Sequence, residues 1–299
     1  MNKKRVLAML LAGAMALSMT ACGGGNSAST DDSSKDGGAS ASGGSYKVSV
    51  ILKTLAAEYW QYVKSGAEDY ASEHSDKVTV EVKGPSSETA FDEMQNMIET
   101  DLSSGSYDGV IISPLQSDTA AQLVSGTKLP IVAIDTNFEA PEVKSFVGTG
   151  NEAAAKKGGE AAVEAAKAAG WTDIKCIEIA GVQGDQTNTA RMNGYKAGVE
   201  EAGGTFLSDE VQYADATADR ATTAMEAIMQ THPEGIAIIC ANNDDMAMAA
   251  ARAAQGHDAY KNTIFLGFNG DRAACEAILA GQMTMSVAQM AYEMGYKAV

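Results

Sequence analysis

The chain has 299 residues and a formal net charge of -17, from 39 acidic and 22 basic side chains. At roughly 150 residues per domain, this length indicates two domains and leaves room for a large buried core. A surface this acidic repels nucleic acid and anionic lipid headgroups, which disfavours functions that depend on neutralising phosphates. A neutral or cationic ligand fits better.

The N-terminus carries the three-part pattern of a secretory signal. The basic run Lys3-Lys4-Arg5 is followed by an apolar stretch over residues 6–12 and then by small residues. The apolar stretch is too short to span a membrane. Because Met19-Thr20-Ala21-Cys22 resembles the lipobox of bacterial lipoproteins, we expect residues 1–21 to be a signal peptide and Cys22 to be the lipidated N-terminus. Ordinary secretory cleavage near Ala21 is the alternative.

The segment after Cys22 has the composition of a linker. Residues 23–45 are almost entirely Gly, Ser, Ala, Asp and Asn, with no large apolar side chain that could nucleate a core. We therefore expect residues 22–45 to form a flexible tether with a root-mean-square span of roughly 25 Å.

From residue 46 onward, short β-branched runs alternate with longer helical stretches. This alternation is typical of parallel sheets covered by helices, and the strands are apolar at their centres, as in strands buried on both faces. The expected strands are 47–52, 78–82, 109–112, 130–134, 174–179, 235–240, 263–268 and 284–288, and the clearest helices are 58–73, 90–103, 152–169, 190–202 and 219–230. We expect an α/β fold of two doubly wound parallel-sheet lobes joined by a hinge. The lobes comprise residues 46–149 plus 290–299 and residues 150–289.

Polar residues follow the carboxyl ends of most of these strands, where open parallel sheets bind their ligands. They are Lys53, Thr54, Ser113, Asp135, Asn242 to Asp245, Asn269 and Gln289, and Arg191 opens the helix after strand 174–179. Carboxylate, carboxamide and guanidinium groups each engage two neighbouring oxygens, which suits the adjacent hydroxyls of a sugar. Thr54, Ser113 and Asp245 are explained equally well as helix caps or turn formers.

Two aromatic residues stand at the start of the first helix. Tyr59 and Trp60 could supply the apolar wall on which the C–H groups of a sugar ring stack. Because they are adjacent in sequence, we expect one to belong to the core and the other, Trp60 by preference, to face the ligand.

The sequence shows no apparatus for catalysis. It contains no G-x-S-x-G, H-E-x-x-H or G-x-x-x-x-G-K-[ST] motif, and its three histidines are isolated from one another. Cys176, Cys240 and Cys275 have no C-x-x-C spacing and are interpreted as buried apolar residues. We expect no catalytic residue, no metal site and no cofactor.

Several motifs together resemble the sugar-binding proteins of bacterial ABC importers, above all the ribose-binding and allose-binding proteins. The segments that carry the resemblance are Val50–Leu55 with Tyr59-Trp60, Tyr107–Leu115, Pro130–Asp135, Arg191–Tyr195, Ala241–Ala247, Leu266–Gly270 and Gly281–Gln289. The resemblance runs from about Tyr46 to the end of the chain. It implies a type I periplasmic binding protein fold with three crossing strands between the lobes, a ligand in the cleft and closure by hinge bending.

The resemblance also implies a set of ligand contacts. They are Lys53, Trp60, Asp135, Arg191, Asn243, Asn269 and Gln289, and with their neighbours Tyr59 and Thr136 they make up the candidate ligand-binding residues. The sequence departs from the family where Ala57 replaces a frequent Asn, Thr136 replaces an Arg or Glu, and Asn269 replaces a usual Asp. The loop 214–219 lacks the aromatic residue that commonly stacks on the second face of the sugar ring, so the sugar is left unnamed. Because family members continue beyond the position of Val299, we expect a final crossing and a closing strand to be missing.

These expectations describe an extracytoplasmic, lipid-anchored, monomeric solute-binding protein. It would capture a sugar or similar polyhydroxylated molecule and deliver it to the membrane permease of an ABC importer. The alternative within the same fold is a sensor domain that presents the ligand to a membrane receptor. The alternative from another class is a secreted carbohydrate-active enzyme, whose cleft would hold an acid, base or metal with perturbed chemistry.

Overall fold

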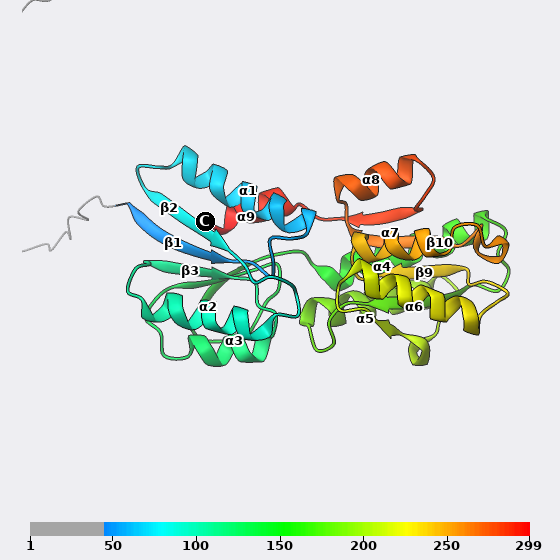
Figure 1. Ribbon diagram of the computed structural model, residues 1–299, viewed down its shortest axis with the longest axis horizontal. Helices are drawn as coiled ribbons and strands as arrows, with labels where there is room; N and C mark the ends of the chain where they lie inside the picture. Colours follow the sequence, from blue (N-terminus) through cyan, green and yellow to red (C-terminus); the bar gives the residue numbers. More distant parts are fainter. Residues whose placement is uncertain (1–44) are drawn as a thin grey trace, which may run out of the picture. The chain divides into compact units, whose positions relative to one another are not determined.

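The computed structural model describes residues 45–299 and shows two parallel sheets, each covered by helices on both faces (Figure 1). This arrangement confirms the expected α/β fold. The expected signal peptide, the lipidation site Cys22 and nearly all of the expected tether lie outside the described residues.

The first sheet has the strand order β2-β1-β3-β4-β5 and is parallel throughout. Its strands are β1 (Tyr46–Ile51), β2 (Val78–Lys83), β3 (Gly109–Ile112), β4 (Ile131–Ile134) and β5 (Val143–Val147). Its helices are α1 (Glu58–Glu73), α2 (Phe91–Ser103), α3 (Ser117–Val124) and α9 (Ala291–Ala298). Successive residues of a strand point to opposite faces. Val50 therefore packs with α1 and α9 on one face, and Ile51 packs with α2 and α3 on the other.

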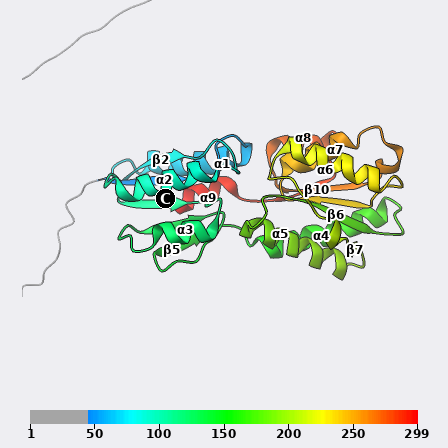
Figure 2. The ribbon, with the colours of Figure 1, turned by 60° about the horizontal axis from the view of Figure 1, so that its bottom comes forward.

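The second sheet has the order β11-β10-β9-β6-β7, and β8 also pairs with β6. Its strands are β6 (Lys175–Ala180), β7 (Thr205–Phe206), β8 (Gln212–Tyr213), β9 (Ile238–Ala241), β10 (Ile264–Asn269) and β11 (Met285–Ala288). Its helices are α4 (Asn151–Ala168), α5 (Gln186–Glu201), α6 (Ala218–Thr231), α7 (Asp244–Ala253) and α8 (Arg272–Leu279), with short 3-10 turns at Ser208–Glu210 and Asp258–Tyr260. Figure 2 shows α4 and α5 on one side of this sheet and α6, α7 and α8 on the other.

The chain passes from the first sheet to the second and later returns. β5 ends at Val147, and α4, which packs on the second sheet, begins at Asn151. After β11 ends at Ala288, α9 packs back against α1 and the first sheet.

Two of the elements that differ from the sequence-based expectation do so for reasons visible in the structure. β5 was not expected because, at the edge of its sheet, it has no continuous apolar run and leaves three of its five residues exposed. α5 begins at Gln186, four residues before the expected start, because the Asp185 side chain caps it and accepts a hydrogen bond from the Asn188 amide at 2.7 Å.

The cysteine interpretation is right for two residues and wrong for the third. Cys176 and Cys240 are buried on the neighbouring strands β6 and β9, with their Sγ atoms 3.4 Å apart. Cys275 is exposed, because α8 buries only Ala274 and Ala277 against its sheet.

The helix pair α4 and α5 packs closely through glycines, which gives a first testable prediction. A Cβ at Gly198 would lie 2.0 Å from the Lys156 carbonyl oxygen of α4, a distance that no real contact allows. We expect Gly198→Val to lower the free energy of unfolding by about 1–3 kcal/mol, as overpacked sites do. Asn193→Val introduces the same side chain at an exposed position of α5 and controls for helix propensity. Urea denaturation of both variants measures the difference, and equal stabilities would contradict the close packing.

Candidate functional site

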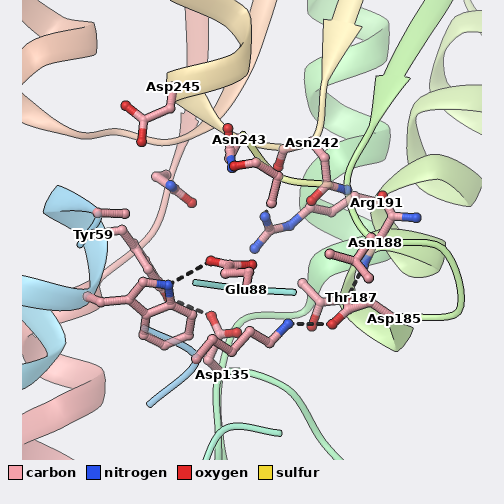
Figure 3. A pocket seen from close by; sticks show the side chains of 16 residues that line it. Tyr59, Glu88, Asp135, Asp185, Thr187, Asn188, Arg191, Asn242, Asn243 and Asp245 are labelled. Atoms are coloured by element: carbon pink, nitrogen blue, oxygen red, sulfur yellow. Dashed lines mark hydrogen bonds and ion pairs between the residues drawn. The ribbon is translucent and has the colours of Figure 1, made fainter. Parts of the chain in front are cut away.

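A cleft is formed at the carboxyl ends of strands from both sheets, where open parallel sheets place their ligands. The space between its walls, including the part open to solvent, is about 510 Å³. The lining residues are Lys53, Ala57, Tyr59, Trp60, Glu88, Asp135, Val182, Asp185, Thr187, Asn188, Arg191, Ala216, Asn242, Asn243, Asp245 and Asn269 (Figure 3).

Seven of the nine residues proposed from the sequence line this cleft together. They are Lys53, Tyr59, Trp60, Asp135, Arg191, Asn243 and Asn269. The two that do not line it are Thr136 and Gln289, and each of them is hydrogen-bonded to a lining residue.

An ion pair spans the cleft between the two lobes. Lys53, just after β1, donates from its ammonium to the Asp185 carboxylate at the start of α5, and both side chains are nearly buried. Burial alone would lower the pKa of Lys53, but the attraction of Asp185, Glu88 and Asp135 outweighs it and raises the pKa above its ordinary value. Lys53 is therefore a fixed cation within the cleft.

Asp135 follows β4 and is held by two hydroxyl groups. Its Oδ1 accepts a hydrogen bond from the Tyr59 hydroxyl at 2.7 Å, and its Oδ2 accepts one from the Thr136 hydroxyl at 3.0 Å. The Thr136 oxygen also lies 2.8 Å from the hydroxyl oxygen of Thr187 in the other lobe. Burial and the negative charge of Asp135 raise the pKa of Tyr59 well above its ordinary value, so this phenol remains a donor. Thr136 thus orients Asp135 from behind instead of lining the cleft.

The backbone is strained at the ends of two strands that reach the cleft. Asp135 after β4 has φ +61°, and Asn269 at the end of β10 has φ +139°, both in the region that favours glycine. Such conformations cost free energy and persist where the surrounding structure enforces them, often at binding sites. The fold thus holds one polar side chain of each lobe at a fixed angle to the cleft.

Arg191 is fixed by three contacts in the second lobe. Its Nε donates to Asn151 Oδ1 at 2.9 Å, and its Nη1 donates to the Asn242 carbonyl at 2.8 Å. The guanidinium also lies 3.9 Å from the centre of the Phe268 ring. These contacts orient the guanidinium and leave its other N–H groups for a ligand.

The side chains of Asn243 and Gln289 make hydrogen bonds mainly to other groups of the protein. Asn243 Oδ1 caps α7 by accepting from the Met246 amide at 2.9 Å, so the helix-cap interpretation that the sequence suggested for Asp245 applies to Asn243. Gln289 accepts from the Thr149 hydroxyl at 2.7 Å and donates to Asn269 Oδ1 at 2.9 Å. Gln289 therefore positions Asn269 and does not face the cleft.

The aromatic pair lies in the cleft wall. The Tyr59 and Trp60 rings meet edge to face with centroids 4.9 Å apart, and Trp60 Nε1 donates to Glu88 Oε1 at 2.9 Å. The expectation that only one of the two faces the cleft is wrong. Both rings line it at the first turn of α1, and both also pack in the core of the first lobe.

Sequence reasoning missed two charged residues of the cleft, Glu88 and Asp185. Both lie in loops that follow strands, Glu88 after β2 and Asp185 after β6. The rule that located Lys53 and Asp135 could have found them if it had been applied to whole loops instead of to the first residues after each strand.

Among residues 45–299, no helix is both long and apolar enough to cross a membrane. Within the same range, no group of three His, Cys, Asp or Glu side chains is arranged to hold a metal ion.

The sequence was compared with known families and proteins. The family described as "Periplasmic binding protein domain" matches residues 48–299. The chain belongs to this family. Among its relatives, the D-allose-binding periplasmic protein of Escherichia coli is 30% identical over 83% of this chain and 80% of its own length. The ribose import binding protein of Bacillus subtilis is 26% identical over 82% of this chain and 76% of its own length. These matches confirm the resemblance to ribose-binding and allose-binding proteins.

Solved structures of periplasmic binding proteins share the fold. A carbohydrate transporter solute-binding protein from Agrobacterium radiobacter, in complex with D-arabinose, superposes with a TM-score of 0.76 at 23% identity, over 85% of this chain and 86% of its own. An ABC transporter solute-binding protein from Bacillus halodurans with bound myo-inositol gives 0.75 at 21% identity, over 87% and 88%. The shared architecture is that of the type I periplasmic binding proteins.

Proposed function

We propose that the protein captures a sugar or similar polyhydroxylated molecule outside the cytoplasm and delivers it to the permease of an ABC importer. The observation that carries this proposal is one cleft lined from both lobes by carboxylate, carboxamide and guanidinium groups beside an aromatic wall. The family relatives include D-allose-binding and ribose-binding proteins, which supports a ligand of this class.

Specific side chains have the chemistry for this task. Asp135 and Asn243 can each engage hydroxyl groups, and Arg191 can donate to two oxygens at once because its plane is held fixed. The rings of Tyr59 and Trp60 offer an apolar surface for the C–H groups of the ligand. The site binds by hydrogen bonds and stacking, and we propose that it performs no catalysis.

The N-terminal segment gives the proposal its cellular setting. We propose that Cys22 is diacylated and tethers a monomeric binding protein to the cell membrane, since two acyl chains give stable anchoring where one does not. The support is the lipobox-like sequence before Cys22 and the linker composition after it.

A thermal-shift screen of pentoses, hexoses and inositols tests the function. A ligand present at about 100 times its Kd stabilises the folded protein by about 2.7 kcal/mol. For a chain of this size, we expect the Tm to rise by roughly 5–10 °C. Titration calorimetry of the best ligand should then give one site per chain. A folded protein whose Tm responds to no polyhydroxylated compound would contradict the proposal.

A further inference from the structure

The cleft carries more negative charge than its own cations balance. Its charged lining residues are the acids Glu88, Asp135, Asp185 and Asp245 and the bases Lys53 and Arg191. With all of them ionised, the lining has a formal charge of -2. Lys53 pairs with Asp185, and the other three acids form no ion pair with any lysine or arginine among the described residues. Negative charge in a partly desolvated cleft is costly unless a cation compensates it.

Asp245 is the least compensated of these acids. It lies half-buried in the first turn of α7 at the edge of the cleft, and it accepts no hydrogen bond from any donor in the described part of the chain (Figure 3). Burial, reinforced by repulsion from Glu58, raises the pKa of the Asp245 carboxyl, and Arg252 counteracts this only in part. Glu88, in contrast, accepts from Trp60 and is attracted by Lys53.

A second observation is a buried amide donor at the cleft that has no acceptor among the described residues. Asn242 lines the cleft and is 6% exposed, and its Nδ2 finds no hydrogen-bond partner between residues 45 and 299. A buried amide donor without an acceptor costs free energy, which a ligand oxygen would recover. An oxygen acceptor would satisfy Asn242, and a cation would compensate the charge of Asp245, within the same cleft.

We propose that the ligand is an amino sugar or a related amino polyol, whose protonated amine binds Asp245 while its oxygens bind Asn242 and Arg191. This inference rests on the proposed function and narrows its ligand class. It also accounts for one of the two acids in excess, because a neutral sugar would leave both uncompensated.

Calorimetry at pH 7 on matched ligand pairs tests the proposal. Each pair consists of a neutral compound and its amino-deoxy derivative, drawn from hexoses, pentoses and inositols with the amine at different ring positions. We expect the tightest ligand to be an amino compound that binds at least tenfold more tightly than its neutral partner. N-acetylation of its amine, which removes the charge, should abolish this preference.

Two variants assign the preference to a residue. Asp245→Asn should bring the affinities of the tightest pair to within about threefold of each other, and its retained binding of the neutral partner would show that it is folded. Asp209→Asn makes the same change at an exposed position in the Ser208–Glu210 turn and should leave the preference intact. A preference that survives in Asp245→Asn overturns the assignment to Asp245.

The two levels of the proposal fail in different ways. If neutral sugars bind as tightly as their amino derivatives, or more tightly, the amine inference is overturned and the sugar-binding function stands. If neither class binds the folded protein, both fail together.

Discussion

Replacing Asp135 with alanine is expected to weaken binding of the ligand by about 100-fold to 1000-fold. Asp135 is 3% exposed, lies at the end of β4, and is oriented by the hydroxyl groups of Tyr59 and Thr136. Loss of its carboxylate would leave ligand hydroxyls buried without a partner, at about 1.5–3 kcal/mol for each hydrogen bond to a charged group. Two such bonds at the lower end of this range, about 3–4 kcal/mol together, correspond to the expected factor, since each 1.4 kcal/mol is tenfold in Kd. Titration calorimetry measures this change.

The backbone at Asp135 requires a matched control. Its φ of +61° is tolerated by Asp and Asn but strains alanine, so part of the effect of Asp135→Ala could be local unfolding. Asp135→Asn keeps the backbone preference and the shape, removes the charge and turns one accepting oxygen into an NH2 donor, so it should give an intermediate loss of affinity and a smaller loss of stability than alanine. A second control, Tyr59→Phe, removes the hydroxyl that donates to Asp135 and should cost about tenfold or less. Unchanged affinity in Asp135→Ala would remove Asp135 from the site.

The fold could be predicted from the sequence wherever a strand is buried on both faces. Segments such as Gly109–Ile112 and Ile238–Ala241 are fully buried, and their continuous apolar runs are visible without a structure. The edge strand β5 is mostly exposed, and β7 and β8 have two residues each. Such elements are held by pairing with neighbours that are distant in sequence, so no local pattern indicates them.

The candidate site could be predicted where a polar residue directly follows a strand. Lys53 and Asp135 were located in this way because parallel strands direct their carboxyl ends to one edge. Asp185 was not predicted because the expected start of α5 lay too far along the chain. With that start, Asp185 was not recognised as the residue that caps the helix. Gln289 also follows a strand, but its amide group is hydrogen-bonded to Thr149 and Asn269 and does not line the cleft. Side-chain partners of this kind depend on tertiary contacts that the sequence does not display.

The protein is expected to lose stability as the pH rises from about 5 to 8, because of one buried carboxyl in the second lobe. Glu178 lies on β6 with 0% exposure, and neither of its carboxyl oxygens has a hydrogen-bond partner in the described residues. Burial raises its pKa to about 8, and the attraction of Arg191 offsets this only in part. The folded protein therefore keeps a proton on Glu178 in a pH range where the unfolded chain has released it.

This difference in bound protons sets the sign and size of the effect. Between the unfolded pKa near 4.5 and the folded value near 8, Glu178 lowers the free energy of unfolding by about 1.4 kcal/mol for each unit of pH. Glu178→Gln keeps the shape of the side chain but cannot ionise. The free energy of unfolding of this variant therefore does not fall with pH on account of residue 178. We expect the variant to be more stable than the wild type at pH 8 by about 4 kcal/mol, with the advantage shrinking to about 1 kcal/mol at pH 5.

Urea denaturation of both proteins across this pH range isolates the contribution of Glu178, because every other titrating group is common to the two. Because Arg191 attracts the Glu178 carboxyl, the comparison is informative for binding as well. Arg191 is held by Asn151, by the Asn242 carbonyl and by the ring of Phe268, and it makes no hydrogen bond to Glu178. Ligand affinity should therefore be retained in Glu178→Gln at pH 6. A stability difference that does not change with pH would show that this carboxyl ionises normally in the folded protein.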